Sequence, residues 1–221
     1  MAPGTREHPR KTLIHAGQAA GPGDEVIIAP GIYHEVLSVG GYPDATQPAV
    51  FRADPIGGAI LRGDDTGEPG KRTIERCRVV VRRPHVRMIG LQVCDTSEQA
   101  MEFAESPGGL VDRCVLRDNQ LDGVLSCRQD GSRVENCIAH DNGRYCIWFH
   151  EMQNGTAVSN TSAATPRAES GVSESPGVVI FSNLSAACGA GLHTIRASYA
   201  TLRSDHNLFS TGVVASRADE Q

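Results

Sequence analysis

LVDRCVLRDN at residues 110–119 is followed, 23 residues further along the chain, by RVENCIAHDN at residues 133–142. The same pattern of a short apolar run, a corner and a second short run extends in both directions. At separations of 23, 23, 24, 23 and 24, its corner position is occupied by Gly90, Arg113, Asn136, Asn160, Asn183 and Asn207. A period this steady predicts one supersecondary unit stacked on copies of itself.

A third strand completes each repeat. It is visible as RVVV at 78–81, MEF at 101–103, VLS at 124–126, IWF at 147–149, GVS at 171–173 and LHT at 192–194, with GVVA at 212–215 next. Gly and Asn tolerate a left-handed backbone, so the corner column predicts one φ > 0 bend in every coil. Three strands and three corners predict one turn of a triangular solenoid, whose coils form three parallel sheets.

The repeats, the Asn column and the segment GPGDEVIIAPGIYHE at 21–35 resemble the right-handed parallel β-helix family of pectate-lyase-like proteins. The resemblance covers about residues 12–215. It implies an all-β fold, a solenoid of about 8–9 coils with a short N-terminal capping helix. It does not specify an activity, because this fold hosts lyases, hydrolases, epimerases, adhesins and inert stalks.

The two ends of the repeat differ. TLIHAGQAA at 12–20 has apolar residues at helical spacing and stops at Gly21-Pro22-Gly23, which predicts the capping helix. We expect a flexible N-terminus at 1–11, a single β-helix domain at 12–216 and a tail at 217–221. Because the C-terminal end has no comparable cap, we expect further coils or self-association to cover its sheet edge.

Composition narrows the classes of function. Hydrophobic residues at 39% with aromatics at only 5% suit a narrow aliphatic core. A formal net charge of −5 argues against nucleic acid as a partner, and no run is long enough to predict a membrane span. The segment 1–11 has no apolar signal core, whereas most of the family is exported, so localisation stays open. Cys114 and Cys137, one repeat apart, are predicted to be neighbours in a buried ladder.

Alternation along the third strand separates core residues from outward residues. The outward set is Arg82, Glu102, Leu125, Cys127, Trp148, His150, Ser173 and His193. The only tryptophan of the chain thus shares one face with two histidines, and flat aromatic faces with flanking polar groups bind sugar rings. The alternative is that Trp148 packs beneath the stretch 165–176 and that the histidines are ordinary solvated residues.

β-Elimination from a uronate sugar needs a base near C5 and a cation that neutralises the carboxylate. We predict His150 or His193 as the base, because imidazole titrates near neutral pH. Arg144 or Arg196 would bind the carboxylate, and Tyr145 would donate a proton to the leaving oxygen. The further predicted substrate-binding residues are Trp148, Arg128, Glu102 and Glu151.

Metal sites and hydrolysis are less well supported. Many members of the family use calcium held by clustered carboxylates, but here Glu102, Glu151 and Glu169 are scattered, so we predict no metal and no cofactor. Asp118-Asn119 over Asp141-Asn142 could hold a cation between coils, but we favour turns that cap their own backbone. Hydrolysis needs two carboxylates on opposite sides of the scissile bond, and the outward face does not offer such a pair.

Three functions remain open. The favoured one is a polysaccharide lyase-like enzyme that acts on an acidic, uronate-containing polysaccharide in a groove on one outer sheet. The alternative is a non-catalytic carbohydrate-binding or structural β-helix module, or a fragment of a longer solenoid. A third is an enzyme for a small metabolite, in which the insertions at 40–47 and 63–73 close the face into a pocket.

Overall fold

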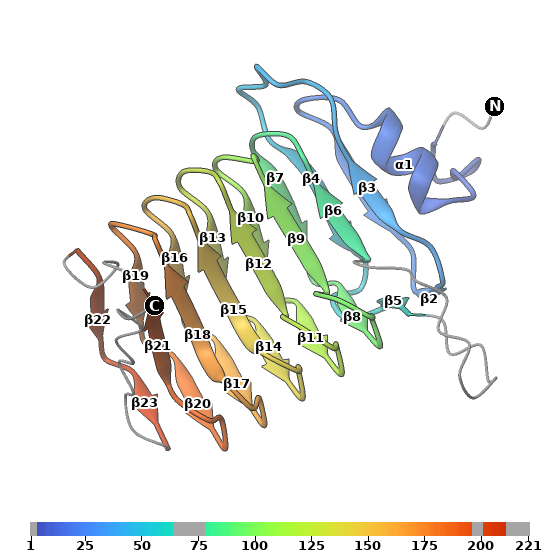
Figure 1. The fold of residues 1–221 in the computed structure, drawn as a ribbon. Coiled ribbons are helices and arrows are strands. Elements are labelled where there is room, and N and C mark those ends of the chain that lie inside the picture. Colours follow the sequence, from blue (N-terminus) through green and yellow to red (C-terminus); the bar gives the residue numbers. More distant parts are fainter. Residues whose placement is uncertain (1–3, 64–77, 196–200, 211–221) are drawn as a thin grey trace.

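The computed structural model describes residues 4–63, 78–195 and 201–210. Its chain winds into a stack of three-stranded coils with helix α1 (Leu13–Ala19) at one end (Figure 1). Within these residues, no helix is long and apolar enough to cross a membrane. The predicted all-β solenoid is therefore the architecture of the described chain.

Three parallel sheets run the length of the stack. Sheet A contains β1 (Glu25–Ile28), β4 (Ala49–Ala53), β7 (Val86–Ile89), β10 (Leu110–Asp112), β13 (Arg133–Glu135), β16 (Thr156–Val158), β19 (Val179–Phe181) and β22 (Arg203–Asp205). Sheet B contains β2 (Gly31–Tyr33), β5 (Ala59–Arg62), β8 (Gln92–Cys94), β11 (Val115–Arg117), β14 (Ile138–His140), β17 (Thr161–Ala163), β20 (Leu184–Ala186) and β23 (Leu208–Phe209). Sheet C contains β3 (Leu37–Val39), β6 (Val79–Val81), β9 (Met101–Ala104), β12 (Val124–Cys127), β15 (Tyr145–His150), β18 (Ala168–Ser173) and β21 (Leu192–Ile195).

The number of coils is lower than predicted. Sheets A, B and C hold eight, eight and seven strands, which makes seven complete coils and two strands of an eighth in the described residues. The prediction of about 8–9 coils is therefore too high for the described residues, in which the coil that begins at β4 also carries the long insertion between β5 and β6. The segment 212–215, predicted as a further strand, lies outside the described residues.

The predicted corner column consists of two adjacent columns. The left-handed residues after sheet A are Gly90, Arg113, Asn136, Ser159, Ser182 and His206, with φ between 52° and 68°. Asn160, Asn183 and Asn207 each lie one residue further along the chain. The 24-residue step from Asn136 to Asn160 therefore crosses from the bend column to its neighbour, which the sequence spacing concealed.

The neighbouring column is a buried hydrogen-bonded ladder. The Nδ2 groups of Asn160 and Asn183 each donate to the Oδ1 of the next asparagine, and both hydrogen bonds are 3.0 Å long. Asn160 Nδ2 also donates to the carbonyl of Val134 at 3.0 Å. Cys114 and Cys137 occupy the same column in the preceding coils and are buried, as predicted. This ladder satisfies polar groups inside the stack and fixes each coil on the next.

Replacing Asn183 by Leu should lower the free energy of unfolding by roughly 1–3 kcal/mol, because buried donors and acceptors lose their partners. The matched control is Asn136→Gly, which keeps the left-handed bend and removes one exposed side chain whose Nδ2 bonds Asp112. Urea denaturation of both variants measures the difference. Equal losses in the two variants would contradict the buried-ladder assignment.

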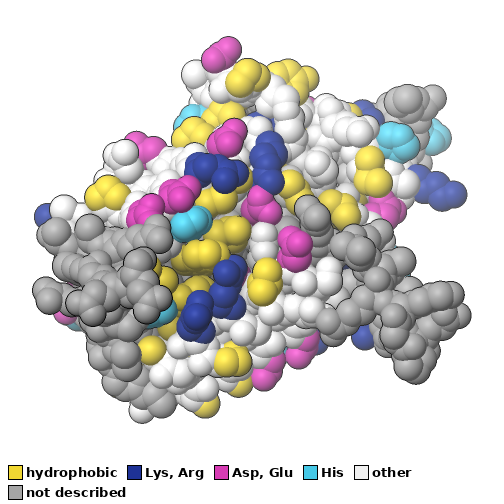
Figure 2. All heavy atoms as spheres, in the orientation of Figure 1, with side chains coloured by type: hydrophobic (Ala, Val, Ile, Leu, Met, Phe, Trp, Pro, Cys, Tyr) yellow, Lys and Arg dark blue, Asp and Glu magenta, His cyan; other side chains and the backbone are white. Residues whose placement is uncertain are grey.

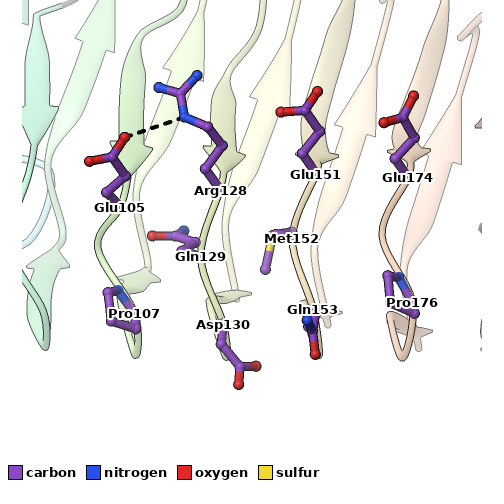
Figure 3. A pocket seen from close by; sticks show the side chains of 10 residues that line it. All are labelled: Glu105, Pro107, Arg128, Gln129, Asp130, Glu151, Met152, Gln153, Glu174 and Pro176. Atoms are coloured by element: carbon purple, nitrogen blue, oxygen red, sulfur yellow. Dashed lines mark ion pairs between the residues drawn. The ribbon is translucent and has the colours of Figure 1, made fainter.

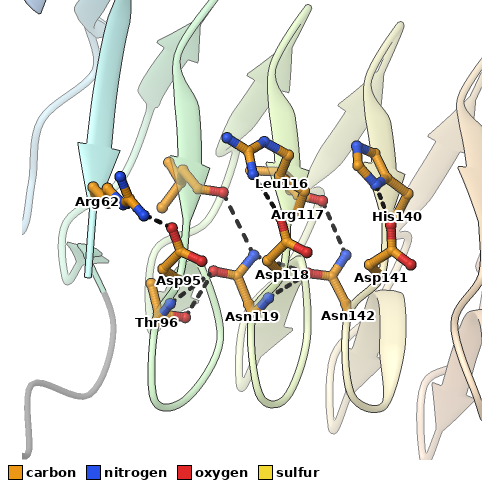
Figure 4. Close-up of polar contacts among 11 residues, drawn as sticks. Arg62, Asp95, Thr96, Leu116, Arg117, Asp118, Asn119, His140, Asp141 and Asn142 are labelled. Atoms are coloured by element: carbon orange, nitrogen blue, oxygen red, sulfur yellow. Dashed lines mark hydrogen bonds and ion pairs between the residues drawn. The ribbon is translucent and has the colours of Figure 1, made fainter. Parts of the chain in front are cut away.

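A second ladder follows sheet B (Figure 4). Thr96 Oγ1 donates to Asn119 Oδ1 at 2.8 Å, and Asn119 Nδ2 donates to Asn142 Oδ1 at 2.8 Å. The preceding aspartates, Asp118 and Asp141, take the left-handed bend with φ of 57° and 53°. The predicted turn is thus formed by the aspartates alone. The side chain of each asparagine makes its hydrogen bonds to a neighbouring coil and does not cap its own turn. Both residues of the pair therefore serve the stack.

Helix α1 covers the first coil. Thr12 caps it, since its Oγ1 accepts from the His15 amide at 3.3 Å. The helix approaches edge strand β3 so closely that a Cβ on Gly17 would lie 2.2 Å from the Ser38 carbonyl oxygen. Only glycine allows this contact, which protects the first rung of sheet C.

Glu169 was predicted to lie near the outer face. The structure places its side chain inside the coil instead. At the start of β18, Glu169 and Ser170 both point inward, and the glutamate is fully buried. Its Oε2 accepts from Ser170 Oγ at 2.9 Å. Burial raises the pKa of Glu169 to about 8, because a carboxylate is costly in an apolar interior.

The raised pKa makes stability depend on pH. The unfolded chain ionises Glu169 near its ordinary value of 4.5, whereas the folded chain does so near 8. The stabilisation that the protonated carboxyl provides is therefore fully present below pH 4.5 and is lost as the pH rises to about 8. Glu169→Gln should flatten the dependence of unfolding free energy on pH across this window. An unchanged pH profile in the variant would contradict the buried, protonated state.

Candidate functional site

The outer face of sheet C carries the predicted site. Strand register places one outward residue of each rung in a single column: Ser38, Val80, Glu102, Leu125, Trp148, Gly171 and His193. A parallel column contains Cys127, His150, Ser173 and Ile195. Hydrophobic side chains gather on this face, with basic side chains on two sides of them (Figure 2). Alternation therefore predicted correctly that Trp148, His150 and His193 share one surface.

Tyr145 was predicted to lie in the corner before the strand, but it is the first residue of strand β15. It is fully buried, and with Ala168, Ala190 and Trp148 it forms a small cluster separate from the main core. Its ring passes over Gly171, where a Cβ would lie 2.8–2.9 Å from three ring atoms. The gap left by this glycine thus lets the ring reach across one rung of the sheet.

The tyrosine hydroxyl meets His193 two rungs away. Tyr145 Oη lies 2.6 Å from His193 Nδ1, and the two rings stack with centroids 5.8 Å apart. Burial, and then the charge of Arg167, lower the pKa of His193 below its ordinary value of 6.5. Burial raises the pKa of Tyr145. At neutral pH the pair is a neutral imidazole bonded to a protonated phenol.

Arg144 is fixed by a buried carboxylate. Its Nε donates to Asp122 Oδ1 at 3.0 Å and its Nη2 to Asp122 Oδ2 at 2.5 Å. Burial raises the pKa of Asp122, while Arg144 and the Tyr145 amide act in the opposite direction. The guanidinium carbon of Arg144 lies 4.0 Å from the centre of the Trp148 ring. This geometry is a cation–π contact held by a fixed ion pair.

Trp148 is half-buried and does not present an open flat face. Arg144 covers its ring, and the His150 ring stacks against it at 4.7 Å between centroids. The stretch 165–176, proposed as a covering loop, contains strand β18 instead. Its Ser173 accepts a hydrogen bond from Trp148 Nε1 at 3.1 Å. The indole therefore packs against Arg144, His150 and Ser173, and its ring is not open for a sugar to stack on.

A depression of about 700 Å³ lies beside this cluster, where sheet B turns into sheet C. Its lining residues are Leu121, Gly143, Arg144, Pro166, Arg167, Gly189, Ala190 and His193. Two guanidinium groups and an imidazole face this space without a carboxylate in the lining. Arg167 was not predicted, although it lies 23 residues after Arg144 and the repeat could have indicated it.

The opposite edge of sheet C is acidic (Figure 3). Glu105, Arg128, Glu151 and Glu174 occupy equivalent left-handed corner positions in successive coils, with φ between 49° and 53°. They line a second depression of about 720 Å³, to which Asp130 adds a carboxylate. Arg128 Nε lies 3.5 Å from Glu105 Oε1. The predicted binding residues Arg128 and Glu151 thus lie across the sheet from Arg144 and His193.

Two further predicted residues have other positions. Glu102 lies on the outward column, where it forms an ion pair with Arg82 and accepts from Gln99 Nε2 at 2.8 Å. Arg196 lies outside the described residues. Of the predicted site residues, Arg144, Tyr145 and His193 therefore lie together, next to Arg167. Glu102 is bound instead to Arg82 and Gln99.

The fold agrees with the comparison to known proteins. Residues 74–217 match the model of the family described as the right-handed β-helix region. The protein belongs to this family. Over 133 residues, the β-helix protein is 26% identical to YwoF of Bacillus subtilis (strain 168), a match that covers 58% of this chain and 28% of that protein. The β-helix protein thus matches less than a third of that relative's length.

Solved structures share the architecture. The β-helix protein is similar to the pectin methylesterase of Aspergillus niger, with a TM-score of 0.60 and 11% identity over 98% of this chain and 85% of that chain. It is also similar to a rhamnogalacturonan lyase, with a TM-score of 0.58 and 15% identity over 99% of this chain and 61% of that chain. At these identities the likeness shows the fold alone.

Gly171→Ala should break the Tyr145–His193 contact, because the new methyl group overlaps the tyrosine ring. Exposure of His193 to water would then raise its pKa toward 6.5, measured by NMR titration of the imidazole. Arg167→Met should also raise this pKa by removing a nearby positive charge. Gly40→Ala is the control, since a Cβ there meets nothing within 4 Å. An unchanged His193 titration in Gly171→Ala would contradict the contact.

Proposed function

We propose that the protein is a polysaccharide lyase-like enzyme that acts on a uronate-containing polysaccharide bound on the outer face of sheet C. The observation that carries this proposal is the imidazole of His193 beside Arg144 and Arg167 in one depression. A base next to cationic groups is what proton abstraction beside a carboxylate requires. The fold shared with a rhamnogalacturonan lyase supports the architecture only.

The substrate carboxylate binds at the basic edge. Arg144 already bonds Asp122 through Nε and Nη2, so Arg167 supplies the bidentate clamp and Arg144 adds positive charge. Partial neutralisation of the carboxylate makes the neighbouring C5 proton more acidic. The acidic edge, with Glu105, Glu151 and Glu174, would repel a uronate and so orients it toward the arginines.

His193 acts as the base in this proposal. In this proposal the imidazole takes the tautomer with its proton on Nδ1, shared with Tyr145 Oη at 2.6 Å, so that the lone pair of Nε2 takes the C5 proton. The electrons of the C5–H bond form the C4=C5 double bond, the C4–O bond breaks, and the leaving oxygen receives a proton from water. Tyr145 is fully buried, so we reassign it from proton donor to the residue that holds His193.

The second candidate is carbohydrate binding without cleavage. The burial of Tyr145 favours it, because the predicted acid of the reaction does not reach a substrate. Hydrolysis has less support, since the carboxylates of Glu102 and Asp122 are each paired with an arginine. A carbohydrate partner belongs to both candidates and is part of the proposal.

Incubation with a panel of uronate polysaccharides should raise the ultraviolet absorbance, because the product contains a C4=C5 double bond conjugated with the carboxylate. His193→Ala should lower the rate of this rise by about 10²–10⁴-fold. The rate should fall only below pH 6.5, because the lowered pKa keeps His193 neutral above it. His206→Ala, on an exposed corner, is the matched control. Retention on a polysaccharide without any absorbance change would favour the binding module. Flat traces without retention would remove both candidates.

A further inference from the structure

A second group of polar side chains lies at the other end of the same strands. Ser173 Oγ lies 2.7 Å from His150 Nδ1, and His150 Nε2 lies 3.6 Å from Glu151 Oε1. Trp148 Nε1 donates to the same serine oxygen at 3.1 Å. The proposed lyase reaction uses neither Ser173 nor the His150 pair.

The directions of these hydrogen bonds follow from the groups themselves. Indole is a donor only, so Ser173 Oγ must accept from Trp148. A proton on His150 Nε2 faces the carboxylate of Glu151, whereas a lone pair there would face a negative charge. Glu151 therefore favours the tautomer whose Nδ1 is unprotonated. The hydroxyl proton of Ser173 then points at Nδ1, in the direction of transfer.

We propose that Ser173, His150 and Glu151 form a nucleophilic site that hydrolyses small carboxylic esters. A serine within hydrogen-bond reach of a base, which a third group orients, is the arrangement that activates a nucleophile. The three residues come from neighbouring rungs: His150 ends β15, Glu151 follows it, and Ser173 ends β18. Their positions are therefore set by sheet register and not by a flexible loop.

The reaction balances without a cofactor. Ser173 Oγ attacks the ester carbonyl carbon while His150 Nδ1 takes the hydroxyl proton, and Glu151 stabilises the imidazolium. The C–O bond to the alcohol breaks, and the alcohol leaves with the proton from Nδ1. Water then attacks the acyl-serine with His150 as base, which releases the carboxylic acid and restores the serine.

Exposure limits the substrate to a small acyl group. Ser173 is 4% exposed, whereas the side chains of His150 and Glu151 are 33% and 44% exposed. The serine is thus reached past the imidazole, so the proposal is restricted to small acyl groups such as acetyl. Glu151 also lines the depression of about 720 Å³, where the alcohol portion of an ester would lie.

The experiment is covalent labelling of the full chain with methanesulfonyl fluoride, a probe no larger than an acetyl donor, followed by intact mass measurement and peptide mapping. One adduct on Ser173 is expected, with loss of fluoride and a proton. Ser173→Ala should lose the adduct, His150→Gln should slow its formation by about 10²-fold or more, and Glu151→Gln should slow it by about tenfold. Hydrolysis of p-nitrophenyl acetate should change in parallel across these variants.

Matched controls are Ser182→Ala and His206→Gln, both on exposed corners, and each should label at the wild-type rate. Circular dichroism checks that every variant folds, and the wild-type adduct map decides the outcome if Ser173→Ala does not. No adduct on the wild-type chain, or an adduct on another residue, would overturn the proposal. Labelling of Ser173 stands or falls separately from lyase activity, because it needs no polysaccharide.

Discussion

Stacking of each coil on the next in fixed register is the constraint on which this structure depends. A coil has no independent core, so its inward residues are buried only when the neighbouring coils cover them. The asparagine ladder from Asn160 to Asn207 enforces that register by satisfying buried polar groups between coils. Side chains that are 23 residues apart in sequence thereby become contacts about one rung apart.

The same constraint builds the candidate site. Tyr145 and His193 are 48 residues apart in sequence, yet register brings their polar atoms to 2.6 Å. The contact also needs Gly171 on the rung between them, because any side chain there would overlap the tyrosine ring. The absence of a side chain at Gly171 thus creates a specific contact on an otherwise regular sheet face, without a change in the spacing of the strands.

Charge divides the two edges of sheet C. One edge carries Arg144 and Arg167 beside His193, and the other carries Glu105, Glu151 and Glu174. A ligand that crosses the sheet would meet opposite fields at its two ends, which gives it a direction. The two proposed chemistries follow this division, since proton abstraction needs the basic edge and the serine site uses a carboxylate.

The parallel stack, the capping helix and the shared face of Trp148, His150 and His193 could all be predicted from the amino-acid order, because period and alternation can be read along the chain. Three features became visible only in the folded chain: Glu169 points inward, the Tyr145 ring crosses Gly171, and two columns lie where the spacing suggested one. Alternation fails at the start of the sheet C strands, where successive residues such as Glu169 and Ser170 both face the core. Which side chain fills the space above a glycine depends on neighbouring coils, and the pattern within one coil does not encode it.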